Sequence, residues 1–321
     1  MRGLLALVFS LAGMAAAQSG PVGLAAVNVA LQAGEADKAL ALLSALPGPE
    51  AGSAEAHNLH CRVLITLQQW DGAVNECRDA VKLESRNSEY HMWLGRALGE
   101  KADRASFMSA YSLAKEVRQE FETAVQLDGH NAEALADLGE FYHSAPGVVG
   151  GGTGKAEGVA AQLDHVDPAR AHELRAAIAE GNKDPATAER ELRQAIAVSQ
   201  HPAFQWMALA SFLRRGKRWA EMEAAVQSGW DAGQRDRHAG VALYNGGTVL
   251  VRANRNPALA VKLFEAYLAG PVKTDEAPAF AAHTALARLH QQMGDTAGAR
   301  RERDAALALA HEYKPALELR L

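Results

Sequence analysis

Residues 203–233 read AFQWMALASFLRRGKRWAEMEAAVQSGWDAG, and the spacing within this stretch decides the fold. Its first half carries Trp206, Leu209 and Leu213 at intervals of three and four, so these side chains share one face of a helix. A break that contains a glycine follows at residues 215–217, and a second apolar series with similar spacing then begins. Two amphipathic helices joined by a short turn predict an antiparallel helical hairpin.

The spacing of this hairpin recurs along most of the chain. A compact apolar residue stands near the start of the second helix of each expected unit, at Ala39, Ala73, Val117, Ala156, Ala188, Met222, Ala260 and Ala299. The intervals between these positions are 34, 44, 39, 32, 34, 38 and 39 residues, which indicates a repeat of about 34 residues with insertions. Capping side chains stand before prolines at three expected helix starts, namely Asp167-Pro168, Asp184-Pro185 and Asn256-Pro257.

Several first helices carry a known signature in whole or in part. The tetratricopeptide repeat has W-x2-L-G-x2-Y in its first helix. The matching segments are Trp206-x2-Leu209-Ala210-x2-Leu213, which follows it most closely, and the partial copies His91-x2-Leu94-Gly95-x2-Leu98 and Leu135-x3-Gly139-x2-Tyr142. The chain therefore resembles a tetratricopeptide-repeat (TPR) protein of an exported bacterial type over most of residues 23–311. The resemblance implies an all-α fold, an α-solenoid in which about eight helix hairpins stack into a right-handed superhelix.

The expected domain organisation is simple. We expect a cleavable signal peptide at residues 1–17 and a single solenoid domain at residues 18–321. The repeats are expected near residues 24–50, 54–87, 88–131, 132–168, 169–202, 203–236, 241–274 and 280–313.

The N-terminal residues have the pattern of a targeting segment. Arg2 is followed by an apolar run from Gly3 to Met14 and by three alanines before Gln18. This order of charge, apolar run and small residues is typical of a secretory signal peptide, and an uncleaved anchor is the alternative. We therefore expect a protein that is exported to the periplasm of a bacterium or secreted.

The composition excludes several classes of function. The net charge is −5, which argues against a general affinity for nucleic acid. No Ser-His-Asp or paired-acid arrangement stands out among the scattered histidines and carboxylates, so we expect no enzyme activity and no cofactor.

The segment 147–155 is rich in glycine and ends in Lys155, which resembles part of a phosphate-binding loop. The match is incomplete, because Val149 occupies the first required glycine position and Ala156 follows the lysine. We interpret the segment as a connection between two helices, with a recognition loop or a binder of nucleotides or small ligands as alternatives.

The two cysteines, Cys61 and Cys77, fall in facing helices of one expected repeat. They could form a disulfide, or they could be two buried thiols. His57 and His60 lie near Cys61, but His60 points away from the face that His57 and Cys61 share. We therefore expect no zinc site there.

The resemblance also implies where a partner would bind. In TPR proteins, positions 2, 5, 9, 12 and 13 of each first helix line a concave groove. Carried over to this chain, the groove candidates include Asn58, Arg62, Met92, Arg96, Glu140, His143, Glu173, Glu180, Met207, Arg214, Arg215, Asn245, Arg252, Arg288 and Gln291. This groove would be mixed or acidic in the middle and basic towards the C-terminus, which suits an acidic peptide or a C-terminal carboxylate.

The sequence therefore predicts a non-catalytic scaffold that binds a protein or peptide segment in its groove. The first alternative is a structural or self-associating component of the bacterial envelope. The weaker alternative is a ligand binder that uses residues 147–155. A polar groove that only binds water remains the simplest reading of the groove residues.

Overall fold

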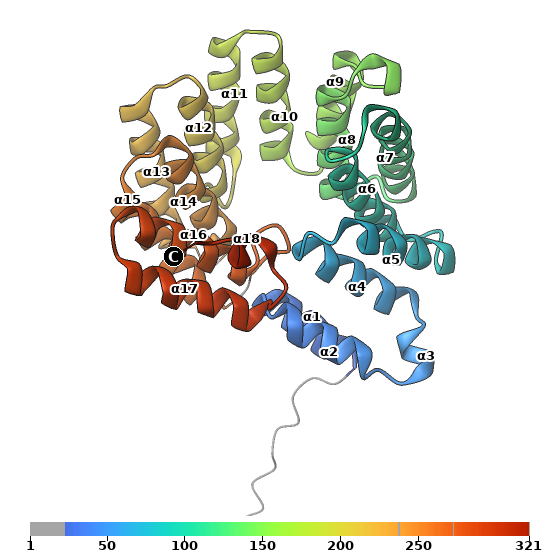
Figure 1. Cartoon of the computed structure of the whole chain (residues 1–321). Helices are drawn as coiled ribbons and strands as arrows, with labels where there is room; N and C mark the ends of the chain where they lie inside the picture. Colours follow the sequence, from blue (N-terminus) through green and yellow to red (C-terminus); the bar gives the residue numbers. More distant parts are fainter. Residues whose placement is uncertain (1–22, 237, 272, 321) are drawn as a thin grey trace, which may run out of the picture.

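The computed structural model describes residues 23–236, 238–271 and 273–320. The expected signal peptide lies outside the described residues. The described part is all helical apart from turns, and it holds eight antiparallel helix hairpins, as predicted. Figure 1 shows the hairpins following one another around a ring, with the first pair beside the last.

The eight hairpins are contiguous along the chain. They are α1 (Leu24–Ala33) with α2 (Ala36–Ser44), α4 (Ala54–Thr66) with α5 (Trp70–Leu83), α6 (Ser88–Ala102) with α7 (Phe107–Leu127), α8 (Ala132–Ser144) with α9 (Thr153–Leu163), α10 (Pro168–Gly181) with α11 (Pro185–Val198), α12 (Ala203–Arg215) with α13 (Trp219–Gly233), α14 (Gly240–Ala253) with α15 (Pro257–Ala269), and α16 (Ala279–Gln292) with α17 (Thr296–Leu309). Three short elements complete the fold: α3 (Gly48–Ala51), the 3-10 turn η1 (Gly147–Val149) and α18 (Lys314–Leu317).

The local signals of the sequence explain where these helices begin. Asp167, Asp184 and Asn256 each accept a hydrogen bond from a backbone N–H of the following turn, and a proline occupies the first helical position after each of them. These caps satisfy amides that the helix itself leaves unpaired, and they confirm the predicted starts of α10, α11 and α15.

The eight aligned positions of the repeat are all buried. Small side chains there let the second helix of each hairpin lie close to its neighbours. Glycine serves the same purpose at Gly95, where a Cβ atom would lie 2.5 Å from the ring of Phe121. The insertion in the third repeat lengthens both of its helices, so that α7 has 21 residues. No helix within the described ranges has the length and apolar character needed to span a bilayer.

The solenoid closes on itself, which the sequence did not predict. One hydrophobic cluster joins Val27 and Leu31 of α1 to Phe280 of α16 and to Tyr313. Gly34, after α1, approaches α16 so closely that a Cβ atom would lie 2.5 Å from the backbone nitrogen of Ala279. The first and last repeats therefore share a core, so the solenoid closes into a ring.

Candidate functional site

The inner face of the ring is the candidate site. Residues of α4, α6, α7, α8, α14 and α16, together with the connection between α15 and α16, line a cavity of about 1070 Å³. Its polar and aromatic lining includes Trp93, Arg96, Asp137, Glu140, Tyr244, Arg252, Glu276 and Tyr313. A smaller cavity of about 460 Å³ adjoins Tyr244, Asn245 and Arg252.

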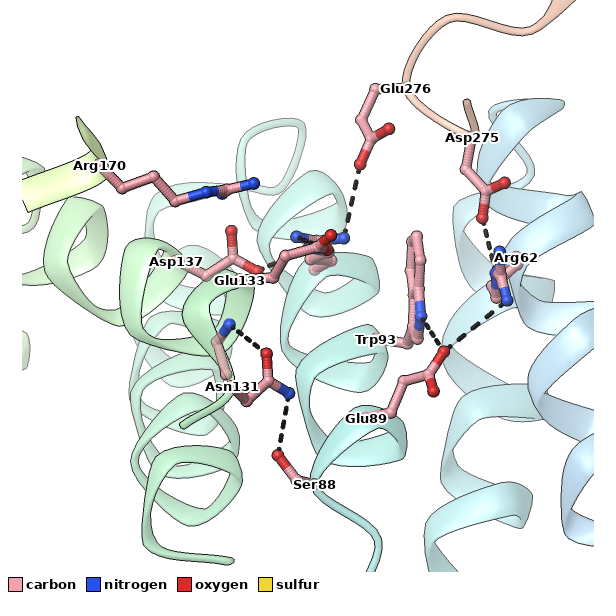
Figure 2. Close-up of polar contacts among 12 residues, drawn as sticks. Arg62, Ser88, Glu89, Trp93, Asn131, Glu133, Asp137, Arg170, Asp275 and Glu276 are labelled. Atoms are coloured by element: carbon pink, nitrogen blue, oxygen red, sulfur yellow. Dashed lines mark hydrogen bonds and ion pairs between the residues drawn. The ribbon is translucent and has the colours of Figure 1, made fainter. Parts of the chain in front are cut away.

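Arg62 and Arg96 lie on one side of this inner face, and Trp93 lies between them. The guanidinium carbon of Arg62 is 4.9 Å from the centroid of the Trp93 ring, and that of Arg96 is 4.7 Å from it. The indole Nε1–H donates to Glu89 Oε1 at 3.3 Å, as Figure 2 shows. Stacking on the indole holds both guanidinium groups in place. We call Arg62 and Arg96 the paired arginines, because carboxylates already surround them.

Asp275 is the main partner of Arg62. Arg62 Nε donates to Asp275 Oδ2 at 2.6 Å (Figure 2), and the two side chains are only 17% and 6% exposed. Burial raises the pKa of the Asp275 carboxyl, against the opposing effect of the Arg62 charge. This is therefore a largely desolvated ion pair. Removal of either group would destabilise the fold, because the other charge would remain buried without a partner.

Arg96 has three carboxylate partners. Its Nε donates to Asp137 Oδ2 at 2.6 Å, its Nη2 to Glu133 Oε2 at 3.0 Å, and its Nη1 to Glu276 Oε1 at 3.5 Å. Burial raises the pKa of Asp137 despite the Arg96 charge, so desolvation is the larger effect on this acid. The donors of Arg96 are thus engaged within the chain.

Residues 273–278, in the connection between α15 and α16, supply Asp275 and Glu276. Tyr267 anchors this segment, since its hydroxyl donates to the Ala277 carbonyl and accepts from the Thr274 N–H at 3.2 Å. The Lys273 N–H donates to the Gln32 carbonyl at 2.6 Å, which ties the segment to α1. The last repeats thereby place two carboxylates on arginines of the second and third repeats.

Arg252, on α14, lines both cavities, whereas Arg288, on α16, lies beside the C-terminal segment that contains Pro315 and Arg320. Among the described residues, neither forms an ion pair with a carboxylate, and Arg288 Nη2 donates to the Pro315 carbonyl at 3.4 Å. Both side chains are exposed. We call Arg252 and Arg288 the open arginines.

Aromatic residues accompany the open arginines. Burial raises the pKa of Tyr244, and the charges of Arg252 and Arg288 both oppose that rise, so both guanidinium groups act on one tyrosine. The Tyr244 ring packs against Phe264 and Tyr267 at centroid distances of 5.4 and 5.6 Å. Burial also raises the pKa of Tyr313 to about 12, again with Arg288 opposing. This side of the ring therefore combines two available cations with a fixed aromatic surface.

The remaining groove candidates have varied surroundings. Arg215 pairs with Glu180 through two hydrogen bonds of 2.6 Å, while Arg214 Nε is buried and has no hydrogen-bond partner in the described structure. His143 packs against Gly181, where a Cβ atom would lie 2.6 Å from the imidazole. The other placements are these: Glu140 is exposed on the large cavity, Asn245 lines the smaller one, and Asn58, Met92 and Met207 are buried.

Glu173, in the middle of the predicted groove, differs from an ordinary surface acid. Burial raises its pKa to about 7, with Arg170 opposing the rise and Asp167 adding to it. Its Oε1 has no hydrogen-bond partner in the described part of the chain. The middle of the groove therefore carries less negative charge at neutral pH than a count of its carboxylates predicts.

The two cysteines form a disulfide between α4 and α5, with their Cα atoms 5.3 Å apart. The nearby histidines both contact Glu76: His57 Nδ1 lies 2.7 Å from Glu76 Oε2, and His60 Nδ1 lies 3.2 Å from Glu76 Oε1. The glycine-rich segment 147–155 contains the 3-10 turn η1, which packs beside α7, and the first residues of α9. Lys155 Nζ donates to the Gly150 carbonyl at 2.8 Å.

Neither a family model nor a curated protein matches the chain. Solved structures do resemble it. Yeast Tom70 is 16% identical with a TM-score of 0.56, over 88% of this chain and 57% of Tom70. TTC0263, a thermophilic TPR protein of Thermus thermophilus, is 19% identical with a TM-score of 0.46, over 56% of this chain and 91% of that one. At these identities the likeness concerns the fold alone, and the chain has the α-solenoid fold of tetratricopeptide-repeat proteins.

Proposed function

We propose that this protein is a non-catalytic scaffold that binds an acidic segment of another protein on the inner face of the ring. The open arginines and the tyrosines beside them form the binding surface. Helical repeats of this type present a preformed surface, so the scaffold itself loses little conformational entropy when an extended segment binds.

The observation that carries this proposal is the difference between the two sets of arginines. The paired arginines are neutralised within the chain, whereas the exposed Arg252 and Arg288 form no ion pair with a carboxylate of the described residues. A guanidinium group presents a planar set of donors that matches a carboxylate, often through two parallel hydrogen bonds. An acidic segment would supply the missing partners.

The adjoining aromatic surface favours an extended peptide over a small free acid as the ligand. Tyr244 lines both cavities, and Phe204, Met207 and Asn245 line the smaller one beside it. Apolar side chains of a peptide could pack there while Asn245 bonds to its backbone.

Peptide binding can be measured by fluorescence anisotropy on the full chain. The probe is a labelled ten-residue peptide of alternating Glu and Ser, and its control has Gln in place of every Glu. We expect saturable binding of the Glu peptide that weakens with added salt. The double variant Arg252→Ala/Arg288→Ala should lose at least tenfold in affinity, because each charge-assisted hydrogen bond contributes about 1.5–3 kcal/mol.

Arg255→Ala is the matched control for this experiment. Arg255 is an exposed arginine just after α14 that pairs with Glu223, outside the residues that line either cavity. Its loss should leave the affinity unchanged. Equal binding of the Glu and Gln peptides, or equal loss in the control variant, would contradict the proposal.

We also propose that the protein acts outside the cytoplasm, in the periplasm or after secretion. The signal-peptide pattern of residues 1–17 supports this, and so does the disulfide, because disulfides persist in oxidising compartments. Mass spectrometry of the mature protein tests it, since a chain that still begins at Met1 would contradict cleavage and export.

Self-association is a second candidate function, and one surface feature favours it. Phe107, Met108 and Tyr111 are exposed at the start of α7, in the part that the insertion adds to the third repeat. An exposed apolar patch often marks a protein interface. Sedimentation of the wild type and of the variant Phe107→Ser/Met108→Ser tests self-association. If the chain associates through this patch, the apparent mass should rise with protein concentration in the wild type but not in the variant.

A further inference from the structure

Two histidines and an aspartate meet at the turns between repeats, away from the inner face. His201 precedes α12, and Asp236 and His238 precede α14. Among the described residues, this is the one group of three histidine, cysteine or acidic side chains whose ligand atoms all lie within 4.8 Å of one another. The stacking of neighbouring hairpins brings these three donors together across 35 residues of sequence.

Two distances within the group are close to those between the ligands of a zinc site. His201 Nδ1 is 2.8 Å from Asp236 Oδ2, and His238 Nδ1 is 3.3 Å from Asp236 Oδ1. In a tetrahedral zinc site with bonds of about 2.0–2.1 Å, neighbouring ligand atoms lie about 3.3 Å apart. A zinc ion could therefore replace the hydrogen bonds between imidazole and carboxylate after only small side-chain movements.

The backbone around the group limits how far the side chains can move. The His201 N–H donates to Ser199 Oγ at 3.1 Å, and the His238 N–H donates to Asp236 Oδ1 at 2.8 Å. The two imidazole rings contact each other edge to face, with their centroids 5.0 Å apart. The donors are thus partly preorganised without a ligand.

The exposure of the group leaves room for further ligands. The Asp236 side chain is 16% exposed, whereas the two imidazoles are 55% and 59% exposed. The carboxylate therefore forms the base of the group and the imidazoles form its open rim. A metal held there would keep at least one position for water or for a side chain of a partner.

We propose that His201, Asp236 and His238 form a binding site for Zn²⁺ or a similar borderline metal ion. Two neutral imidazoles and a carboxylate suit zinc, copper and nickel, while calcium and magnesium prefer sites made of oxygen ligands. The ion would connect the α11–α12 turn to the α13–α14 turn, and so stabilise the junction of three successive hairpins. This site was not predicted from the sequence, since His201 is distant in sequence from Asp236 and His238.

Isothermal titration calorimetry on the full chain, after treatment with EDTA, tests the site. We expect saturable binding of one Zn²⁺ per chain and no heat of binding with Ca²⁺. The variant His201→Ala/His238→Ala should weaken zinc binding at least tenfold. Zinc should also raise the melting temperature of the wild type but not that of the variant.

His130→Ala is the control, because His130 is also an exposed histidine near a turn but has no part in the group. It should bind zinc like the wild type. Zinc binding that is absent in the wild type, or that survives unchanged in the double variant, would overturn the proposal. The second result would indicate another site, such as Glu76 with His57 and His60.

Discussion

The paired arginines and the open Arg288 differ in their neighbours, not in their place in the repeat. Arg62, Arg96 and Arg288 all occupy the ninth position of the expected first helix of their repeats. Two of them contact carboxylates of the chain itself, whereas Arg288 has none among the described residues. The position in the repeat thus sets which way a side chain faces, and the neighbouring repeats decide whether its charge is available to a partner.

Removal of a paired arginine should have the largest effect on stability. Arg62→Met leaves Asp275 buried without its partner, which we expect to lower the free energy of unfolding by about 3–5 kcal/mol. Arg252→Met, on the open side, should change it by less than about 0.5 kcal/mol. Urea denaturation of the two variants measures both values.

The double variant Arg62→Met/Asp275→Leu checks the cause. It removes both charges, so it should recover much of the lost stability. If Arg62→Met and Arg252→Met unfold at the same urea concentration, the distinction between paired and open arginines is wrong.

The disulfide offers a second comparison between the two sides. Cys61 and Cys77 link the hairpin that carries Arg62, while the hairpin that carries Arg252 has no such link. A closed loop of about 15 residues contributes about 3 kcal/mol. Reduction, or the variant Cys61→Ser/Cys77→Ser, should lower stability by about that amount and leave binding of the acidic peptide intact. A loss of peptide binding at temperatures where the variant remains folded would contradict the separation of the two sides.

Glu173 lies in α10, between the two sides along the ring, and should give the wild type a dependence on pH. Its pKa of about 7 exceeds its ordinary value of 4.5, so the folded state binds more protons than the unfolded state between these values. Stability should therefore fall as pH rises from about 5 to 8, by about 2–3 kcal/mol from this residue. Glu173→Gln should remove that contribution.

The measurement is the difference in free energy of unfolding between wild type and Glu173→Gln at each pH, since other titrating groups then cancel. Glu180→Gln is a suitable control, because Glu180 forms a surface pair with Arg215. A difference that stays constant over this pH range would show that burial does not raise this pKa.

The sequence was sufficient to predict the hairpins, because their signals are local. Compact residues at Ala73 and Ala188, and caps such as Asp184, act within one repeat and its neighbours. The closure of the ring could not be predicted in the same way. It depends on the small rotation between successive repeats, summed over all the hairpins, and no short sequence motif determines that sum.

Whether Arg62 is paired within the chain or available to a partner depends on this closure. The contact between Arg62 and Asp275 spans 213 positions of sequence. Arg62 was therefore a reasonable groove candidate from its repeat position, and its partner Asp275 could be found only in the folded ring. His201 and Asp236 meet for a similar reason, since they come from separate turns.

The smallest expected effect separates the charge of an open arginine from its shape. Arg252→Lys keeps the positive charge but loses the planar set of donors that can hold a carboxylate through two hydrogen bonds. We expect the affinity for the alternating Glu and Ser peptide to fall about threefold to fivefold, which corresponds to about 1 kcal/mol or less. Arg96→Lys, on the paired side, should leave that affinity unchanged, because its donors already bind Asp137 and Glu133. If both lysine variants bind the peptide like the wild type, the inner face attracts acidic segments by net charge alone, and the geometry of the open arginines contributes no specificity.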